Sequence, residues 1–349
     1  MRNITSIILI CTEFLLLVSC RSATLDATSI PSPQARRPSE AVVISTSSQA
    51  TLPPAEAVKP VEVLRSNEYS EGVVIDHDDN VYFSHGKSIT VLASDGTNRI
   101  WAETGDPNGH KVLADGTHLV ANRSKQEVLH LDADGKILGV VAKEFNGKRL
   151  RAPNDLTLDA QGGFYFTDPG GSSLKNPIGT VYYVDHSRKI QQVVTRLAFP
   201  NGIVLTPDGK RLFVGESHKN RILVSNVLAP GKIGPQQVFA ELPVKQGEQI
   251  DNQPDGMCLD VMKNLYVAHY GMREVQVLDP DGKLIRRYPV GNLTTSNCAF
   301  GGPQLDQLYV TGGIEKEAGQ GGLFRLDLGV PGLDIRPSRQ GATPTKKDG

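Results

Sequence analysis

Cysteine is scarce in this sequence, with four residues among 349. Cys11 and Cys20 lie in the N-terminal apolar segment, which leaves Cys258 and Cys298 for a folded domain. Two cysteines cannot build a framework of disulfides, although one bridge is possible in an oxidising compartment. Because each lies in an apolar run, two buried free thiols are the favoured interpretation. No Cys/His cluster has the spacing of a zinc site.

An excess of charge of either sign is also missing. Lys plus Arg number 37 and Asp plus Glu number 38, so the sequence offers no basic face for nucleic acid, and we expect no nucleic-acid partner. Long amphipathic helical patterns are absent. No Gly-Xaa-Ser-Xaa-Gly segment marks the nucleophile of a serine hydrolase. These absences point to a β-rich protein without a nucleophilic serine.

The first 20 residues are predicted to be a signal peptide. Arg2 gives a basic start, and the mostly apolar residues 7–18 are too few to span a membrane comfortably. Residues 17–20, Leu-Val-Ser-Cys, resemble the lipobox of bacterial lipoproteins, in which the cysteine becomes the acylated first residue. The alternative is cleavage by ordinary signal peptidase without lipid. We therefore predict an exported, periplasmic or cell-envelope protein that contacts the membrane only through lipid on Cys20.

The remainder is predicted to consist of a tether, a folded domain and a tail. Residues 21–60 are rich in Ser, Thr, Pro and Ala and have no sustained period, which is typical of a flexible tether. We expect the folded domain over residues 61–330. Residues 331–349 are predicted to form a disordered tail.

One phrase recurs through residues 61–330. It consists of a short apolar strand, an Asp/Gly/Asn turn, and a second strand rich in aromatic and β-branched residues. The clear copies occupy residues 73–86, 156–170, 203–217, 258–271 and 298–313, with a weaker copy at 110–123. Six copies give about 45 residues per copy, the length of a four-stranded propeller blade. We predict an all-β, six-bladed β-propeller around a central channel, closed by residues 61–64 pairing beside 323–329.

The residues that precede each inner strand should converge at one end of the channel. In chain order they are Glu71-Gly72, His110, Asn154-Asp155, Asn201-Gly202, Asp255-Gly256 and Ser296-Asn297. Nearly every position offers an oxygen-bearing side chain, which suits a hard cation such as Ca²⁺, with Mg²⁺, Mn²⁺ or Zn²⁺ able to substitute. The alternative is that these Asp and Asn residues only form turns.

The same segments resemble the regucalcin/gluconolactonase family, also called the senescence marker protein family. The resemblance rests on the motifs Glu71-Gly72, RAPNDLTLDAQGGFYFTDP (151–169), PNGIVLTPDGKRLFVGES (200–217), QPDGMCLD (253–260) and TTSNCAFGG with LYVTGG (294–313). They cover all but one blade in the right order, and the Pro-Asn-Asp form is similar to the bacterial gluconolactonase branch. The resemblance implies a six-bladed propeller that hydrolyses sugar lactones with a divalent metal.

The resemblance also implies roles for individual residues. Glu71, Asn201 and Asp255 would be metal ligands, and Asn154 would lie beside them, on the metal or on the substrate. Asp255 would also be the general base in a direct hydrolysis, with the metal polarising the lactone carbonyl and activating water. Arg151 is a candidate substrate contact or a solvated loop residue. In one departure from the family, Val73 and Val74 follow Glu-Gly, where proline and often an aromatic residue are usual.

Other interpretations stay open for the function and for three further residues. The protein could be a non-catalytic, envelope-tethered propeller that binds sugars or proteins. It could also be another metal-dependent esterase or lactonase, similar to the paraoxonase or strictosidine-synthase-like groups. His269 could reach the site, although a structural role is favoured, and His110 and Ser296 are expected to line the channel.

Overall fold

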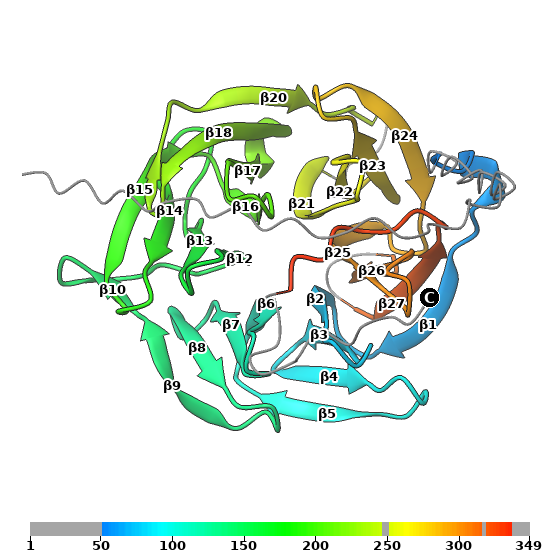
Figure 1. Ribbon diagram of the computed structural model, residues 1–349, viewed down its shortest axis with the longest axis horizontal. Coiled ribbons are helices and arrows are strands. Elements are labelled where there is room, and N and C mark those ends of the chain that lie inside the picture. Colours follow the sequence, from blue (N-terminus) through cyan, green and yellow to red (C-terminus); the bar gives the residue numbers. More distant parts are fainter. Residues whose placement is uncertain (1–50, 246–250, 316–318, 337–349) are drawn as a thin grey trace, which may run out of the picture. The chain divides into compact units, whose positions relative to one another are not determined.

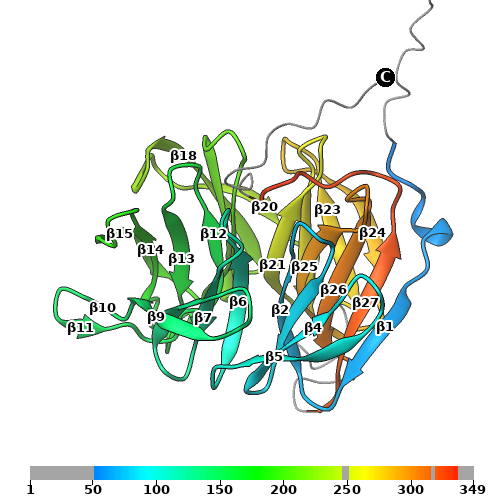
Figure 2. The same ribbon diagram turned by 60° about the horizontal axis from the view of Figure 1, so that its bottom comes forward.

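A computed structural model of the chain describes residues 51–245, 251–315 and 319–336 (Figures 1 and 2). The chain divides into two units, Met1–Ser48 and Gln49–Gly349, and every described residue belongs to the second. The predicted signal peptide with its lipobox, residues 21–50 of the tether and residues 337–349 of the tail lie outside the described residues. No described helix has the length and apolar character needed to cross a membrane.

The described residues fold mainly as antiparallel β-strands, with two short 3-10 helices, η1 (Ala55–Ala57) and η2 (Ser217–Lys219). The first sheet contains β2 (Ser70–Ile75), β3 (Val81–His85), β4 (Ser88–Leu92) and β5 (Asn98–Glu103). The second contains β6 (Pro107–Val112), β7 (His118–Asn122), β8 (Glu127–Leu131) and β9 (Ile137–Ala142). The third contains β12 (Leu156–Leu158), β13 (Phe164–Asp168), β14 (Gly179–Val184) and β15 (Ile190–Leu197). A small hairpin of β10 (Glu144–Phe145) and β11 (Lys148–Arg149) precedes the third sheet.

Two larger sheets contain the remaining strands. The five-stranded sheet contains β16 (Pro200–Leu205), β17 (Arg211–Glu216), β18 (Arg221–Ala229), β19 (Lys232–Ile233) and β20 (Gln237–Glu241). The eight-stranded sheet contains β21 (Gln253–Leu259), β22 (Leu265–Tyr270), β23 (Glu274–Leu278), β24 (Leu284–Pro289), β25 (Thr294–Gly301), β26 (Gln307–Gly313), β27 (Gly321–Asp327) and β1 (Val61–Ser66). Within it, β21–β24 form one antiparallel run and β25–β26–β27–β1 another, joined only through the pair Tyr270–Thr294.

The sheets follow one another around a ring in chain order, from blue to red in Figure 1. Their first strands, β2, β6, β12, β16, β21 and β25, face the middle of the ring. Residues of these inner strands are mostly buried, whereas the outer strands β5, β9 and β24 are largely exposed or half-buried. The part of the chain that the structure describes is therefore an all-β, propeller-like arrangement.

The hydrophobic core lies between neighbouring sheets. Tyr165 and Val181 of the third sheet pack with Ile203 and Leu212 of the five-stranded sheet, and equivalent clusters fill the other seams. Each large apolar side chain buried there stabilises the folded state by about 1.5–3 kcal/mol relative to the same side chain left in water. The first strand β1 pairs with the last, β27, through Val61–Arg325 and Leu64–Leu323. The closing pair that the sequence predicts is confirmed.

The folded contacts extend past the predicted limits of 61 and 330 at both ends. The Tyr288 hydroxyl donates to the Pro53 carbonyl at 2.9 Å, and Val58 is buried. At the other end, the Leu333 N–H donates to the Leu259 carbonyl at 2.8 Å, and Arg336 Nη1 donates to the Asp76 carbonyl at 2.7 Å. Residues 51–60 of the expected tether and 331–336 of the expected tail thus pack on the sheets.

Candidate functional site

Three of the four predicted ligands, Glu71, Asn201 and Asp255, lie at irregularities of the inner strands. The pairing register shifts between Ser70 and Val73 in β2, between Pro200 and Ile203 in β16, and between Pro254 and Met257 in β21. Each interruption contains an oxygen-bearing residue followed by glycine: Glu71-Gly72, Asn201-Gly202 and Asp255-Gly256. A bulge re-aims a side chain and tolerates proline, because the ladder of hydrogen bonds is broken there. The same local device therefore recurs at one end of these strands.

Close backbone contacts show that neighbouring bulges lie at the same level around the ring. No Cβ fits at Gly72 because of the Asn108 carbonyl, or at Gly202 because of the Asp255 carbonyl. The Gly109 N–H donates to the Asn154 carbonyl at 2.7 Å, which joins the second and third sheets.

Side-chain hydroxyls join other seams at this level, donating from one sheet to a backbone carbonyl of the next. The bonds run from Thr167 to Asn201 (2.7 Å), from Ser217 to Pro254 (2.7 Å) and from Ser296 to Ser70 (2.7 Å). The structure thus brings Glu71, Asn154, Asn201 and Asp255 to the same end of the inner strands.

Asn108 belongs to this ring, and sequence reasoning missed it. The sequence pattern aligns the weak second copy on His110, but the register of β6 shifts between Pro107 and His110, so Asn108-Gly109 occupies the bulge. His110 instead lies deeper, fully buried, with Nε2 at 2.6 Å from Nδ1 of His118. The signal that could have found Asn108 is the tripeptide Pro-Asn-Gly at 107–109, which is repeated at 200–202.

Three of the four predicted ligands are buried, and two of these have a side-chain oxygen that meets no hydrogen-bond donor among the described residues. Asn154, Asn201 and Asp255 are buried, and the Glu71 side chain is 14% exposed. The Oδ1 atoms of Asn154 and Asn201 are buried and meet no hydrogen-bond donor within the described part of the chain. Leaving such an acceptor unsatisfied costs about 1–3 kcal/mol. Two orphaned amide oxygens at the level of two carboxylates therefore indicate a ligand that accepts lone pairs.

This donor set fits a hard divalent cation, which takes carboxylate and amide oxygens. Among the residues described, no group of three or more His, Cys, Asp and Glu side chains could hold a metal. The predicted set contains only two carboxylates, so its other donors must be amides. Arg123 adds positive charge at the rim, with Nη1 3.7 Å from Oε1 of Glu71.

The remaining candidate residues have structural partners. The exposed Arg151 donates from Nη1 to the Ile178 carbonyl at 3.0 Å. His269 is buried and lies with Nε2 2.8 Å from Oδ1 of Asn220, and burial lowers the pKa of His269 to about 3. A neutral, hydrogen-bonded histidine agrees with the structural role favoured by the sequence.

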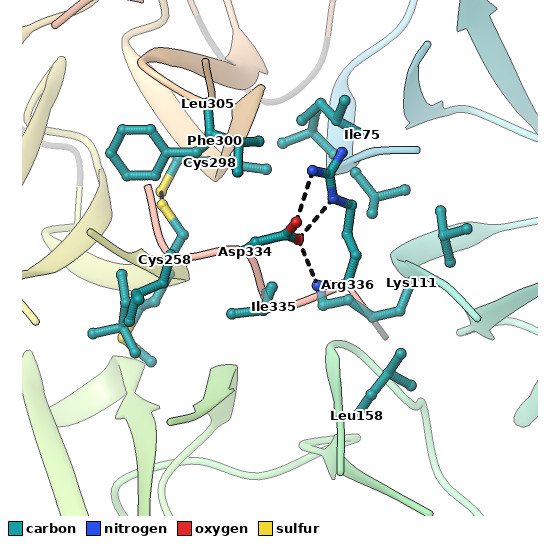
Figure 3. A pocket seen from close by; sticks show the side chains of 17 residues that line it. Ile75, Lys111, Leu158, Cys258, Cys298, Phe300, Leu305, Asp334, Ile335 and Arg336 are labelled. Atoms are coloured by element: carbon teal, nitrogen blue, oxygen red, sulfur yellow. Dashed lines mark hydrogen bonds and ion pairs between the residues drawn. The ribbon is translucent and has the colours of Figure 1, made fainter. Parts of the chain in front are cut away.

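A cavity lies toward the other end of the inner strands (Figure 3). Its lining includes Ile75, Leu158 and Leu259, which end β2, β12 and β21, together with residues 333–336. Cys258 and Cys298 face each other there as free thiols, with their Sγ atoms 3.6 Å apart, and burial raises the pKa of Cys258. Residues 331–336, the last part of the red ribbon, cross the ring at this end (Figures 1 and 2), so the bulges lie at the end away from them.

One charged pair lies between the two ends. Lys111 Nζ lies 3.6 Å from Oδ1 of Asp155, and both side chains are largely buried. Asp155 also accepts the N–H of Leu156 at 2.8 Å. Its carboxylate is therefore engaged by its own sheet and by the neighbouring one.

Comparison with known proteins identifies the family. Residues 69–313 match the family model described as the SMP-30/gluconolactonase/LRE-like region. The chain belongs to this family. The matched residues contain every predicted ligand, and the resemblance identified from the sequence motifs is confirmed.

Several known proteins are similar to this chain at moderate sequence identity. The diisopropyl-fluorophosphatase of Loligo vulgaris is 28% identical over 222 residues, which are 59% of this chain and 68% of that protein. Lactonase drp35 of Staphylococcus aureus (strain USA300) is 31% identical over 198 residues, half of this chain and 58% of the lactonase. A solved structure of a gluconolactonase from Xanthomonas campestris superimposes with a TM-score of 0.67 at 25% identity, covering 79% of this chain and 91% of that one.

Proposed function

We propose that this protein is a metal-dependent lactonase that hydrolyses sugar lactones. The observation that carries the proposal is the pair of orphaned amide oxygens, on Asn154 and Asn201, at the level of the Glu71 and Asp255 carboxylates. The lactonase and gluconolactonase names among its relatives support the substrate class. A propeller that only bound sugars or proteins would not need this convergence of buried acceptors.

The proposal includes six blades. Counting β21–β24 and β25–β26–β27–β1 as separate blades gives, with the four other large sheets, six units around the channel. The single pair Tyr270–Thr294 that merges the two runs lies at their ends, which supports counting them apart. The blade that contains β1 would then be built from both ends of the domain.

Glu71, Asn154, Asn201 and Asp255 would hold the cation, with Ca²⁺ the natural occupant because every donor is oxygen. When bound, a divalent cation supplies Lewis-acid polarisation of a carbonyl and a lowered pKa for nearby water. Asn108 lies on the same ring and would face the substrate or the water around the cation.

Asp255 would act as the general base that accepts a proton from the attacking water. Its backbone is held by the contact with Gly202 and by the bond from Ser217 to the Pro254 carbonyl, so the carboxylate needs little reorganisation. Asn154 and Arg151 would orient the sugar hydroxyls. The substrate would enter at the end with the bulges, since residues 333–336 occupy the other end.

The location of the enzyme is a separate proposal. Cleavage before Cys20 and lipidation of that residue would tether the domain to a membrane of the cell envelope, with residues 21–50 as the connecting segment. The substrate would then be a lactone outside the cytoplasm. The lipid would be the protein's only membrane contact.

The decisive experiment is turnover of glucono-1,5-lactone by the purified protein with and without exhaustive chelation. The proposal expects hydrolysis that chelation abolishes and added Ca²⁺ restores. No turnover of this or any aldonolactone in the metal-loaded protein would favour a binding propeller. Full turnover after chelation would contradict the metal mechanism and favour another type of esterase.

A further inference from the structure

A fully buried carboxylate stands behind the candidate ligand Asn154. Asp168 is the last residue of β13, and its carboxylate accepts the N–H of Arg151 (3.1 and 3.0 Å to its two oxygens) and the N–H of Ala152 (2.6 Å). Both donors belong to the short segment that leads into Asn154. The Asn154 N–H also donates to the Thr167 carbonyl at 2.9 Å, so β13 fixes this segment at three points.

The next sheet repeats the arrangement behind Asn201. Glu216 is the last residue of β17 and is also fully buried, and its Oε1 accepts the N–H of Ala198 at 2.9 Å. Ala198 precedes Asn201 by three positions, as Arg151 precedes Asn154. The two carboxylates therefore bond the same point of equivalent segments in consecutive sheets.

The two acids balance their charge differently. Lys219 Nζ lies 3.0 Å from Oε1 of Glu216, and Arg221 Nη2 lies 2.7 Å from Oε2. Burial raises the pKa of Glu216, but the bond from Ala198 and these two cations outweigh it and leave the pKa lowered. For Asp168, burial raises the pKa, and the bonds from the N–H groups of Ala152 and Arg151 only partly oppose it.

Carboxylates are costly to bury, and the sheets that contain Glu71 and Asp255 have histidines at the equivalent position. The residue paired with Ser70, just before Glu71, is His85, and the residue paired with Pro254, just before Asp255, is His269. Carboxylates occupy this place only in the two described sheets whose candidate ligand is one of the orphaned amides. Burying a carboxylate costs free energy unless hydrogen bonds or cations compensate its charge. Their presence in these two described sheets alone therefore calls for a specific role.

We propose that Asp168 and Glu216 are positioning residues that aim the Asn154 and Asn201 oxygens at a divalent cation. The inference rests on the proposed function, because the cation is the ligand it assumes. Asp168 fixes the main chain three and two residues ahead of Asn154, and Glu216 fixes it three residues ahead of Asn201. Each carboxylate thereby holds an amide oxygen where no described residue donates a hydrogen bond to it. Removing the anchor lets the amide turn to a local donor and lowers the affinity for the cation.

The test is Ca²⁺ titration of the full-length protein by calorimetry, comparing wild type with Asp168→Asn and Glu216→Gln. Loss of a group that orients a metal ligand typically weakens metal binding about 10- to 100-fold. The matched control is Asp159→Asn, at the opposite end of the β12–β13 hairpin. Asp159 also accepts two backbone N–H groups, those of Gln161 (2.7 Å) and Gly163 (2.9 Å), but faces away from the bulges.

The inference expects a loss of Ca²⁺ affinity of at least about 10-fold in each anchor variant. The control should bind as wild type does, even where its melting temperature in chelator falls as far. Wild-type affinity in a folded anchor variant, or an equal loss in the control, would overturn it. If Asp168→Asn does not fold, Glu216→Gln decides the question alone. If wild type itself binds no Ca²⁺, the proposed function fails first, so the two failures are distinguishable.

Discussion

The carbonyl group of Asp255 occupies the space in which a Cβ on Gly202 would lie. Gly202 follows the candidate ligand Asn201, and Asp255 is the candidate ligand of the next sheet. Two predicted ligands are therefore spaced by direct contact of backbone with backbone. No flexible side chain lies between them to absorb a change.

Gly202→Ala should disturb this contact. The added methyl group meets a backbone carbonyl, so the strands must separate, at a cost of about 1–3 kcal/mol in the free energy of unfolding. We expect a lower melting temperature and weaker Ca²⁺ binding, measured by thermal denaturation and calorimetry. Gly234→Ala is the control, because its Cβ would meet the nearest atom, the Asn226 carbonyl oxygen, at an ordinary 3.6 Å. Unchanged metal affinity in a folded Gly202→Ala protein would contradict the shared spacing.

Asp255→Asn should abolish most of the lactone turnover while leaving the fold intact. Asparagine can serve the same turn but cannot accept the proton, and loss of a general base typically costs about 10²- to 10⁴-fold in rate. Asn201→Asp is the contrast, because it adds charge without removing a base, and it should retain metal and lose less activity. Turnover, metal content and circular dichroism of both variants check the expectation. A folded Asp255→Asn protein within a few-fold of wild type would leave the base unassigned.

Removing the metal should lower the thermal stability of the protein. A ligand that binds only the folded state at 100 times its Kd stabilises that state by about 2.7 kcal/mol. The melting temperature should therefore be lower in chelator and should rise with the Ca²⁺ concentration. In Asp255→Asn the difference between the two melting temperatures should be smaller. Coincident curves for the wild type would argue against a cation held by these four residues.

Acid should destabilise the fold through its buried histidines. Burial lowers the pKa of His118 to about 4 and that of His269 to about 3, whereas an unfolded histidine titrates near 6.5. Below pH 6.5 the unfolded chain takes up protons that the folded one does not, so stability is full above this pH and declines as the pH falls toward 4. Between pH 7 and 5 each histidine should remove about 2 kcal/mol from the free energy of unfolding.

Denaturant unfolding of the wild type and of His269→Gln from pH 7 to 5 checks whether the free energy of unfolding falls with pH as expected. The variant should lose part of the pH dependence, because its amide does not titrate. His186→Gln, at an exposed position, should keep the wild-type slope. A stability that rises from pH 7 to 5 would contradict the assignment of neutral buried histidines.

Cys20→Ala should move the protein from the membrane fraction to the soluble fraction of an expressing bacterium. The reason is that acylation needs the cysteine, and we expect no other membrane contact. Fractionation, with mass spectrometry of the mature N-terminus, is the measurement. Wild-type protein that is already soluble and begins at a residue other than the one at position 20 would exclude the lipobox.

Much of the fold could be predicted because the strands repeat a local phrase. The pattern before Val73, Ile203 and Met257 located three inner strands and the polar residues ahead of them. Asn108 was missed because its copy has weak strand periodicity, so the copy was aligned on His110 and the tripeptide Pro-Asn-Gly at 107–109 was not used. The anchors Asp168 and Glu216 left no local signal, since an acid at a strand end is ordinary turn chemistry. Their role depends on contacts with residues up to 18 positions away.

The limits of the domain were hard to predict for a related reason. Residues 51–60 and 331–336 have no period of their own, and they are ordered by the sheets on which they pack. The Arg336 guanidinium, for instance, donates a hydrogen bond to the backbone carbonyl of Asp76, 260 positions earlier in the sequence. Such docking depends on surfaces that exist only after folding.

The pairing of β1 with β27 also sets the timing of folding during synthesis. Val61 is among the first residues of the domain to emerge from the ribosome, and its partner Arg325 is among the last. The strand β1 must therefore wait, unpaired, while almost the whole domain is made. Contacts so distant in sequence form slowly. A chain that stopped before β27 would leave both β1 and β26 without the strand that pairs with them, so the first and last strands of the domain could not be joined.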